Sequence, residues 1–451
     1  MNLRRLALYL LPIPILAALA FFLIGRQLPE DAPLPEAPRQ VLPSAQFANP
    51  AATVAYYEER LRRTPDDDGA FAPLAQAHLQ LASETGRETE HVPAAQRAIE
   101  EGLRRMPDDY HLLLLKGTLL NKLHRFEEAR DLAEGAIARH PRHAYAYGVL
   151  VDALVELGEY DRAVMALDTM LAIKPGIPSY SRAAYLRELH GDGDGAIAAM
   201  RMAADAGLAG TPDRSWALYQ LGLLYLNEAK PDTAAFLFRG LLQERPDYPY
   251  AVAGLGQVAL ATGAYDDAIE RFETAYVMAP HGAFRELLAE AHAAAGHDAE
   301  AEEALRGVRA DLAAAREMGE IVEMEEADFM LDNGIQPNKA LVMAKRQVER
   351  RPDHLHAQET YAWALHHTGR SAEAIPVIER VIAFGAGDAM VHHRAAQIYQ
   401  GAGRPADAAR HARLAIENRL RVESPSAADE AERMLASMES GTPIQTASTS
   451  R

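Results

Sequence analysis

The chain contains no cysteine among its 451 residues. This absence excludes disulfide bonds, thiolate metal sites, cysteine nucleophiles and a lipid-modified N-terminal cysteine. It does not identify the compartment, because a protein without thiols is insensitive to the redox conditions around it.

Aromatic residues and positive charge are also scarce. Aromatics make up 7% of the chain, which favours helices packed through small residues over a sheet rich in aromatic side chains. The formal net charge of −18 argues against a nucleic-acid partner, which would need a basic face. A single compact core rarely exceeds about 250–300 residues, so we expect several domains or an elongated array.

The common motifs of catalysis and nucleotide binding are missing. The sequence has no Walker-type GxxxxGK, no HExxH and no GxSxG. No strand is expected before any glycine cluster, which removes the dinucleotide fingerprint. We therefore expect a protein that is not an enzyme, with no cofactor and no small-molecule substrate.

One long uncharged run stands near the N-terminus. Arg4 and Arg5 precede the run from Leu6 to Gly25, which as a helix is long enough to cross a bilayer. Residues 1–27 are expected to form a single-pass inner-membrane anchor, with the N-terminus cytoplasmic and the body periplasmic. The alternative is a signal peptide cleaved near Ala20, which would release the chain into the periplasm.

From residue 50 onward one pattern recurs, with a dominant period of 34 residues. The stretch Ser215–Tyr248 shows it best, with Gly222 on a first helix and Ala234 and Phe238 on a second. Small residues let the two helices approach, and bulky ones fill the seam between them. Proline stops the second helix because it lacks an N–H. The helix-closing prolines are Pro65, Pro107, Pro141, Pro175, Pro212, Pro246, Pro280 and Pro352.

In these features the chain resembles the tetratricopeptide-repeat family over roughly residues 50–422. The resemblance implies an all-α fold, a right-handed α-solenoid of about ten helix-turn-helix repeats, preceded here by the expected transmembrane helix. Ser179–Gly207 and Glu359–Ile375 also resemble segments of a group of bacterial envelope repeat proteins. This second resemblance implies no activity and no binding residues.

Composition and repeat phase divide the chain into successive segments. The seventh repeat has a long second helix without a closing proline, which predicts a bend between two arrays. The expected segments after the anchor are a proline-rich linker at 28–50, an N-terminal array with a capping helix at 51–310, a C-terminal array at 311–425, and a capping helix with a disordered tail at 426–451.

The turn "ELHGDGDGAI" (Glu188–Ile197) raises the alternative of a calcium loop. Its phase places it between the two helices of one repeat, and it lacks the closing glutamate of such a loop. Aspartate and glycine are the usual residues of a tight turn, with Asp194 the expected N-cap of the second helix.

In tetratricopeptide repeats the first helices line a concave groove, and this geometry selects candidate binding residues. Aromatic side chains with a few polar groups suit a peptide or an extended segment. The alternative for each residue is that it packs between neighbouring repeats. The candidates are Tyr145, Arg182, Trp216, Tyr219, Tyr250, Gln257, His356 and Trp363.

The histidine pairs offer a different kind of site. His366, His367 and His393 would suit a metal-binding accessory subunit of an enzyme. Adjacent residues on a helix point about 100° apart, so a pair rarely supplies two ligands to one ion. We therefore expect no metal at these positions.

The predicted function is a non-enzymatic, membrane-tethered scaffold of the bacterial cell envelope that binds a peptide or protein in its groove. The alternative is an assembly subunit of an envelope biogenesis machine such as cytochrome c maturation. The acidic excess lies mostly on outer helix faces and would disfavour acidic partners.

Overall fold

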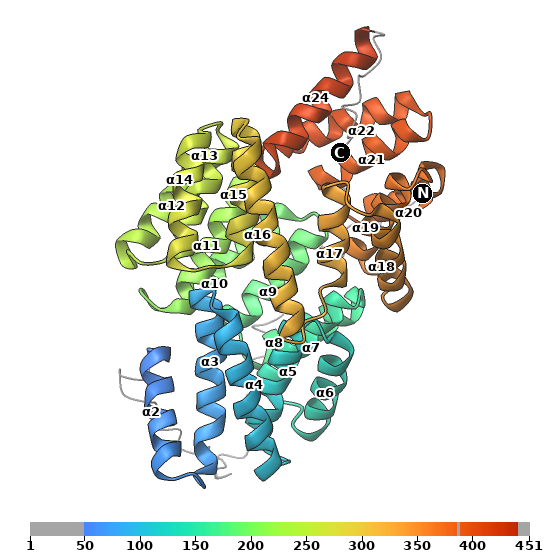
Figure 1. The fold of residues 1–451 in the computed structure, drawn as a ribbon. Helices are drawn as coiled ribbons and strands as arrows, with labels where there is room; N and C mark the ends of the chain where they lie inside the picture. The colour runs from blue at the N-terminus through green and yellow to red at the C-terminus, as the bar shows by residue number, and fades with distance from the viewer. Residues whose placement is uncertain (1–48, 386–387, 441–451) are drawn as a thin grey trace, which may run out of the picture. The chain divides into compact units, whose positions relative to one another are not determined.

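The computed structural model describes residues 49–385 and 388–440 (Figure 1). Within these ranges the chain forms 23 α-helices and one short 3₁₀ turn (Asp68–Ala70), and no strand. The residues from Asn49 onward group into one compact unit. The all-α solenoid predicted from the repeat is confirmed.

Ten helix pairs follow one another along the chain, each with a first and a second helix. The first seven pairs are α3 (Phe71–Thr85) with α4 (Glu88–Arg105), α5 (Tyr110–Lys122) with α6 (Phe126–Arg139), α7 (Ala144–Glu156) with α8 (Tyr160–Ile173), α9 (Ile177–Leu189) with α10 (Gly193–Asp205), α11 (Pro212–Asn227) with α12 (Pro231–Glu244), α13 (Pro249–Ala261) with α14 (Tyr265–Met278), and α15 (Gly282–Ala295) with α16 (Asp298–Glu317).

Three further pairs complete the array, with single helices at both ends. The three pairs are α17 (Glu323–Asp332) with α18 (Pro337–Arg350), α19 (Leu355–His367) with α20 (Ser371–Phe384), and α21 (Ala389–Gly401) with α22 (Pro405–Glu417). The single helices are α2 (Pro50–Arg63) before the first pair, and the short α23 (Leu420–Glu423) and α24 (Pro425–Ser440) after the last.

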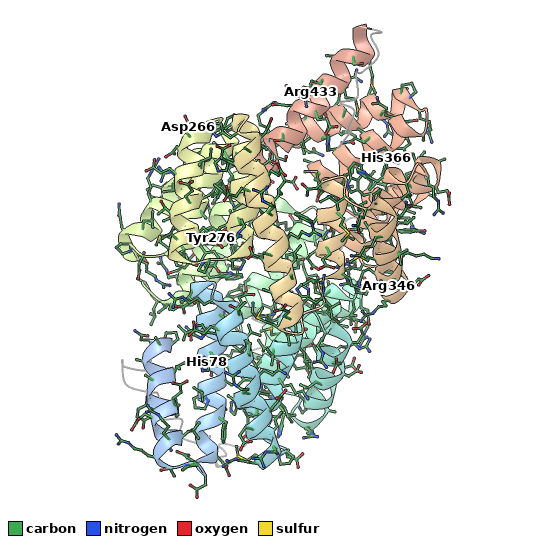
Figure 2. All side chains as sticks on the ribbon, viewed as in Figure 1. His78, Asp266, Tyr276, Arg346, His366 and Arg433 are labelled. Carbon is green, nitrogen blue, oxygen red and sulfur yellow. The ribbon has the colours of Figure 1, made fainter. Side chains whose placement is uncertain are left out.

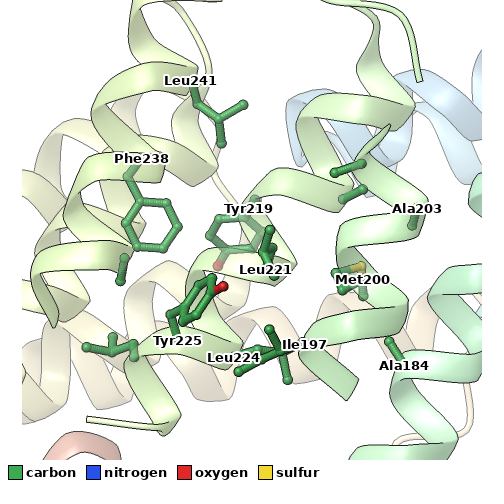
Figure 3. Close-up of a cluster of buried hydrophobic side chains, with 14 of the residues drawn as sticks. Ala184, Ile197, Met200, Ala203, Tyr219, Leu221, Leu224, Tyr225, Phe238 and Leu241 are labelled. Atoms are coloured by element: carbon green, nitrogen blue, oxygen red, sulfur yellow. The ribbon is translucent and has the colours of Figure 1, made fainter. Parts of the chain in front are cut away.

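The close approach of first and second helices depends on glycine at defined places. Phe238 of α12 is fully buried, in a cluster that also holds Tyr219 and Leu221 (Figure 3). A Cβ atom at Gly222 of α11 would lie 2.4 Å from a ring carbon of Phe238. A larger residue at 222 would therefore displace the phenylalanine, which explains why the sequence pattern places glycine there.

The turn between α9 and α10 corrects one expectation. Asp192, rather than Asp194, caps α10, because its side chain accepts a hydrogen bond from the Gly195 N–H at 2.9 Å. The helix begins at Gly193, earlier than the sequence pattern indicated. Gly191 has φ +74°, the left-handed conformation that a non-glycine residue rarely adopts. The segment is a turn with an N-cap.

The seventh pair contains the long second helix that the sequence predicts. Helix α16 has 20 residues, and α17 begins at Glu323 after a short connection. The predicted boundary at residue 310 lies inside α16, and the division into two arrays stays a prediction. Below, the N-terminal repeats are α3–α16 and the C-terminal repeats are α17–α22.

Charged side chains occupy the outward faces of the second helices. Asp266 of α14 and Arg346 of α18 are exposed, and Figure 2 shows both at the periphery of their helices. The charges of these two residues lie on solvated surface, where water and salt screen them.

Several hydrogen bonds join segments that are far apart in the sequence, and three of them illustrate this. Tyr250 donates its hydroxyl to the Ser83 carbonyl at 2.6 Å. The Leu355 N–H donates to the Tyr160 hydroxyl at 3.0 Å, and Arg419 Nη1 donates to the Asn227 carbonyl at 2.8 Å. Repeats that are far apart in the sequence thus contact one another, which the repeat pattern does not predict.

The predicted single-pass inner-membrane localisation is contradicted. Across residues 49–385 and 388–440 no helix combines the length and the apolar character needed to cross a bilayer. The longest helix of this part, α16, carries acidic residues in its first turn and Arg316 in its last. The run Leu6 to Gly25 and the cleavage position near Ala20 lie outside the described residues.

Candidate protein-binding site

Two cavities adjoin on the side of the array where first helices face one another. The first cavity, of about 530 Å³, lies between α5, α7 and α9 on one side and α17, α18 and α19 on the other. The second cavity, of about 630 Å³, lies between α9 and α11 on one side and α19, α21 and α23 on the other. Tyr185 and His356 line both cavities, so the two cavities adjoin at these residues.

Tyr185 is the large exposed aromatic residue at this junction. It stands on α9, and 48% of its surface is exposed. Burial of the hydroxyl, with the nearby carboxylates of Glu156 and Glu188, raises the pKa of Tyr185 above its ordinary value. The ring therefore faces an acidic and partly dehydrated space.

The wall of the first cavity carries both signs of charge, largely paired. Arg182 holds the Asp152 carboxylate with Nε at 2.7 Å and Nη2 at 2.5 Å. Arg350 pairs with Glu127 at 3.1 Å across the two halves of the array. A two-point guanidinium–carboxylate contact fixes the orientation of both groups, so this wall is well ordered.

The second cavity is acidic. Its wall holds one arginine, Arg419, which pairs with Glu228 at 3.1 Å. Burial, together with the carboxylates of Asp388 and Glu359, raises the pKa of Glu423 to about 7. The carboxylates that line this cavity are those of Glu188, Glu228, Glu359, Asp388, Glu417 and Glu423.

His356 supplies a positive charge at the junction. Its Nε2 lies 2.8 Å from the Asp328 carboxylate. Burial lowers the pKa of His356, but the hydrogen bond and charge of Asp328 outweigh this effect and raise the pKa to about 9. The imidazolium is therefore charged at neutral pH and is already satisfied by Asp328.

Beside the second cavity, Arg394 organises a buried polar network. It contacts Glu359 at 2.9 Å and Asp332 at 3.2 Å. Its guanidinium lies 5.6 Å from the centre of the Trp363 ring, and the Trp363 Nε1–H donates to Asp332 at 2.9 Å. This network joins α17, α19 and α21, and removal of one buried charge would leave its partners uncompensated.

Two of the eight candidate residues present aromatic surface to solvent. Tyr145 is 42% exposed, and its hydroxyl shares a hydrogen bond of 2.7 Å with Thr118. Trp216 is 40% exposed. Two others, Arg182 and His356, line the cavities.

The remaining four candidates are engaged in packing. Tyr219 and Trp363 are buried, and Gln257 is hydrogen-bonded to the Tyr219 hydroxyl. The Tyr250 ring packs at an angle against that of Tyr219, with ring centres 5.5 Å apart, and its hydroxyl donates a hydrogen bond to the Ser83 carbonyl. The structure thus brings Arg182 and His356 together at the first cavity and leaves these four inside the array.

Two of the three histidines considered as a metal site, His366 and His393, have other partners. His366 Nδ1 lies 3.1 Å from the Ser371 hydroxyl, and His393 Nε2 lies 3.4 Å from the Glu430 carboxylate. Figure 2 places His366 on α19. Among residues 49–385 and 388–440, no three histidine, aspartate or glutamate side chains gather in a way that would hold a metal ion.

Sequence reasoning missed Tyr185, although a signal for it exists. Tyr185 stands five residues before the C-cap His190, as Gln257 does before Thr262 and Trp363 before Thr368. It therefore occupies the same repeat position as two of the candidates. Counting back from the C-caps would have found it.

Family models for tetratricopeptide repeat match four stretches of the chain. One matches residues 120–188 and 225–276, and another matches residues 254–316 and 337–389. The matched stretches include parts of the helices on each side of the two cavities. The matches agree with the helix pairs that the structure shows.

One curated relative is Cellulose synthase operon protein C of Pseudomonas fluorescens (strain SBW25). It is 28% identical over 137 residues, which cover 28% of this chain and 10% of that protein. The chain thus spans about a tenth of the length of the relative it matches.

Two solved structures are among those similar to this chain. A thermophilic tetratricopeptide-repeat protein of Thermus thermophilus is 23% identical with a TM-score of 0.33, covering 38% of this chain and 92% of that one. Yeast Tom70 is 13% identical with a TM-score of 0.34, covering 86% of this chain and 93% of that one.

Proposed function

This chain is a tetratricopeptide-repeat protein, and we propose that it is a non-enzymatic scaffold that binds a segment of a partner protein against its first helices. Tetratricopeptide-repeat domains generally mediate protein–protein interaction, and their fold generally carries no catalytic machinery. The proposed binding surface is the pair of cavities joined at Tyr185 and His356, together with the exposed rings of Tyr145 and Trp216.

The observation that carries the proposal is that the two cavities adjoin at Tyr185 and His356. Together they run from α5 to α23, and their walls combine aromatic, apolar and charged side chains. An extended segment places side chains at regular intervals, so it can use such a surface at several points. Tyr145 and Trp216 stand exposed on first helices, and exposed aromatic residues are enriched at the centres of protein interfaces.

The test is site-specific photo-crosslinking in cells that make the full chain. A photoreactive residue replaces Tyr145 or Trp216 on first helices, and in matched controls it replaces Met165 or Phe236. These controls are 70% and 73% exposed and stand on the second helices α8 and α12. All four positions are accessible to solvent. They differ mainly in whether they stand on the first or the second helices of the array.

We expect one defined adduct from the first-helix positions and none from the second-helix positions. The adduct should be lost when Tyr185 is changed to Arg, because a long cationic side chain would pair with Glu156 and Glu188 and fill the cavity junction. The same adduct pattern from all four positions would show that the first helices hold no specific site, and would overturn the proposal.

A further inference from the structure

The Tyr185 ring at the cavity junction has no partner of its own. Among the residues that the structure describes, none gives it a hydrogen bond, a ring contact or a cation over its face. Other aromatic rings of the chain lie close to an arginine side chain of the same chain. Arg394 lies 5.6 Å from the Trp363 ring, and Arg404 lies 4.9 Å from the Tyr399 ring. The Tyr185 ring is thus an exposed aromatic face without an internal cation.

The two carboxylates nearest Tyr185 also lack a lysine or arginine. In the described part of the chain, Glu188 accepts one hydrogen bond from the Asn227 amide at 3.4 Å and forms no ion pair. Glu156 lies 3.6 Å from His354 Nε2. Burial, followed by the charges of Arg351 and His356, lowers the pKa of His354 to about 3, so this histidine is neutral at pH 7.

Arg351 does not neutralise Glu156 by direct contact. Its Nη1 donates to the backbone carbonyl of Glu156 at 3.0 Å, and its Nη2 donates to Gln347. Asp152, the third carboxylate near Tyr185, already forms an ion pair with Arg182. It is therefore less free to bind a cation from a partner. Glu156 and Glu188 are therefore the carboxyl groups at the junction without an ion pair to a lysine or arginine, and burial raises the pKa of both.

We propose that the Tyr185 ring, with Glu156 and Glu188 beside it, binds a lysine or arginine side chain of the partner polypeptide. An aromatic face attracts a cation through its quadrupole, and the carboxylates add charge and hydrogen-bond acceptors. The acidic wall of the second cavity favours further positive charge along the same segment. This inference rests on the proposed function and specifies the chemistry of its ligand.

The test is isothermal titration calorimetry of the full chain with a defined probe. The probe is a five-residue peptide with blocked ends, in which one arginine and one lysine alternate with glycine. A matched peptide carries citrulline and acetyl-lysine at the same places and so keeps the length but loses the charge. We expect the charged peptide to bind at least about tenfold more tightly at low salt, since opposite charges at a partly buried site attract.

Variants identify the ring and the carboxylate. Tyr185→Ala should weaken binding of the charged peptide about three- to fivefold, while Tyr185→Phe should keep it because the ring remains. Glu188→Gln should also weaken binding. Phe236→Ala is the control, since Phe236 is 73% exposed and lines neither cavity. Circular dichroism of each variant checks that it is folded.

Three results would overturn the inference. The first is equal affinity for the charged and neutral peptides. The second is the same affinity in Tyr185→Ala as in Phe236→Ala. The third is tighter binding of free spermidine than of the charged peptide with the same dependence on Tyr185, which would assign the site to a small polyamine. If any of these results is found while the crosslinks from Tyr145 and Trp216 persist, the proposed scaffold function stands. The inference that the partner binds through a lysine or arginine is then wrong.

Discussion

The Leu355 N–H donates a hydrogen bond to the Tyr160 hydroxyl at 3.0 Å, although the two residues are 195 positions apart in the sequence. Tyr160 is buried, and Leu355 and Phe384 pack against the hydrophobic cluster to which it belongs. The contact joins α8 of the N-terminal repeats to the start of α19. Leu355 also lines the second cavity.

Tyr160→Phe should loosen this junction. The change leaves the Leu355 N–H without its acceptor, at a cost of about 1 kcal/mol in the free energy of unfolding. Chemical denaturation measures the stability, and amide hydrogen exchange at Leu355 reports the local bond. The control is Tyr147→Phe, because the Tyr147 hydroxyl makes an exposed local bond to the Pro141 carbonyl. Unchanged exchange at Leu355 would contradict the assigned contact.

Gly158 gives a sharper test of the same junction. Its φ is +77°, and a Cβ there would lie 2.5 Å from the backbone nitrogen of His354. Gly263 is the matched control, since its φ is +80° and a Cβ there would meet nothing within 4 Å. Both alanine variants bear the left-handed backbone penalty of about 1 kcal/mol.

Gly158→Ala should therefore lower the melting temperature more than Gly263→Ala. The difference between the two losses in melting temperature measures the steric conflict with His354, because both variants bear the same backbone penalty. Differential scanning calorimetry of the full chain compares the two. Equal losses would mean that the turn at Gly158 does not pack against α19 in solution.

The contrast between Gly222 and Gly158 shows what the sequence can predict. Gly222 meets Phe238 of the adjacent helix, and this partner is visible within one repeat as a fixed spacing. Gly158 meets His354, and that contact depends on the rotation accumulated over several repeats. The helix pairs follow from local spacing, whereas the closure of the array does not.

The candidate binding residues show the same limit. Trp363 has the type and position of a groove residue, but Asp332 and Arg394 from neighbouring repeats bury it. Tyr185 has the same repeat position and stays exposed, because its neighbours at this level leave a cavity. A repeat position therefore predicts which face a residue is on, and the side chains of adjacent repeats decide whether it is accessible.

Acid should destabilise the last helix pair through His411. His392 and His411 are buried with their Nδ1 atoms 3.0 Å apart, so the shared hydrogen bond requires one nitrogen without a proton. Burial, with the charge of Arg410, lowers the pKa of His411 to about 4. The unfolded chain takes up its proton near pH 6.5, so stability is complete above that value and falls towards pH 4.

The expected slope from one such histidine is up to about 1.4 kcal/mol per pH unit. His411→Gln removes this titration and should make the loss of stability between pH 6.5 and pH 4 shallower than in the parent chain. Denaturation curves at a series of pH values measure both slopes. Identical slopes would show that His411 is not held neutral in the folded protein.

The most direct test of the scaffold account is hydrogen–deuterium exchange on the complex with the partner that crosslinking at Tyr145 identifies. Binding in the joined cavities predicts slower exchange in the first helices α7, α9, α11 and α19, with the strongest effect around Tyr185 and His356. Exchange in the second helices α8, α10 and α12 should be unchanged. Slower exchange confined to those second helices would place the partner on the other face and contradict the account.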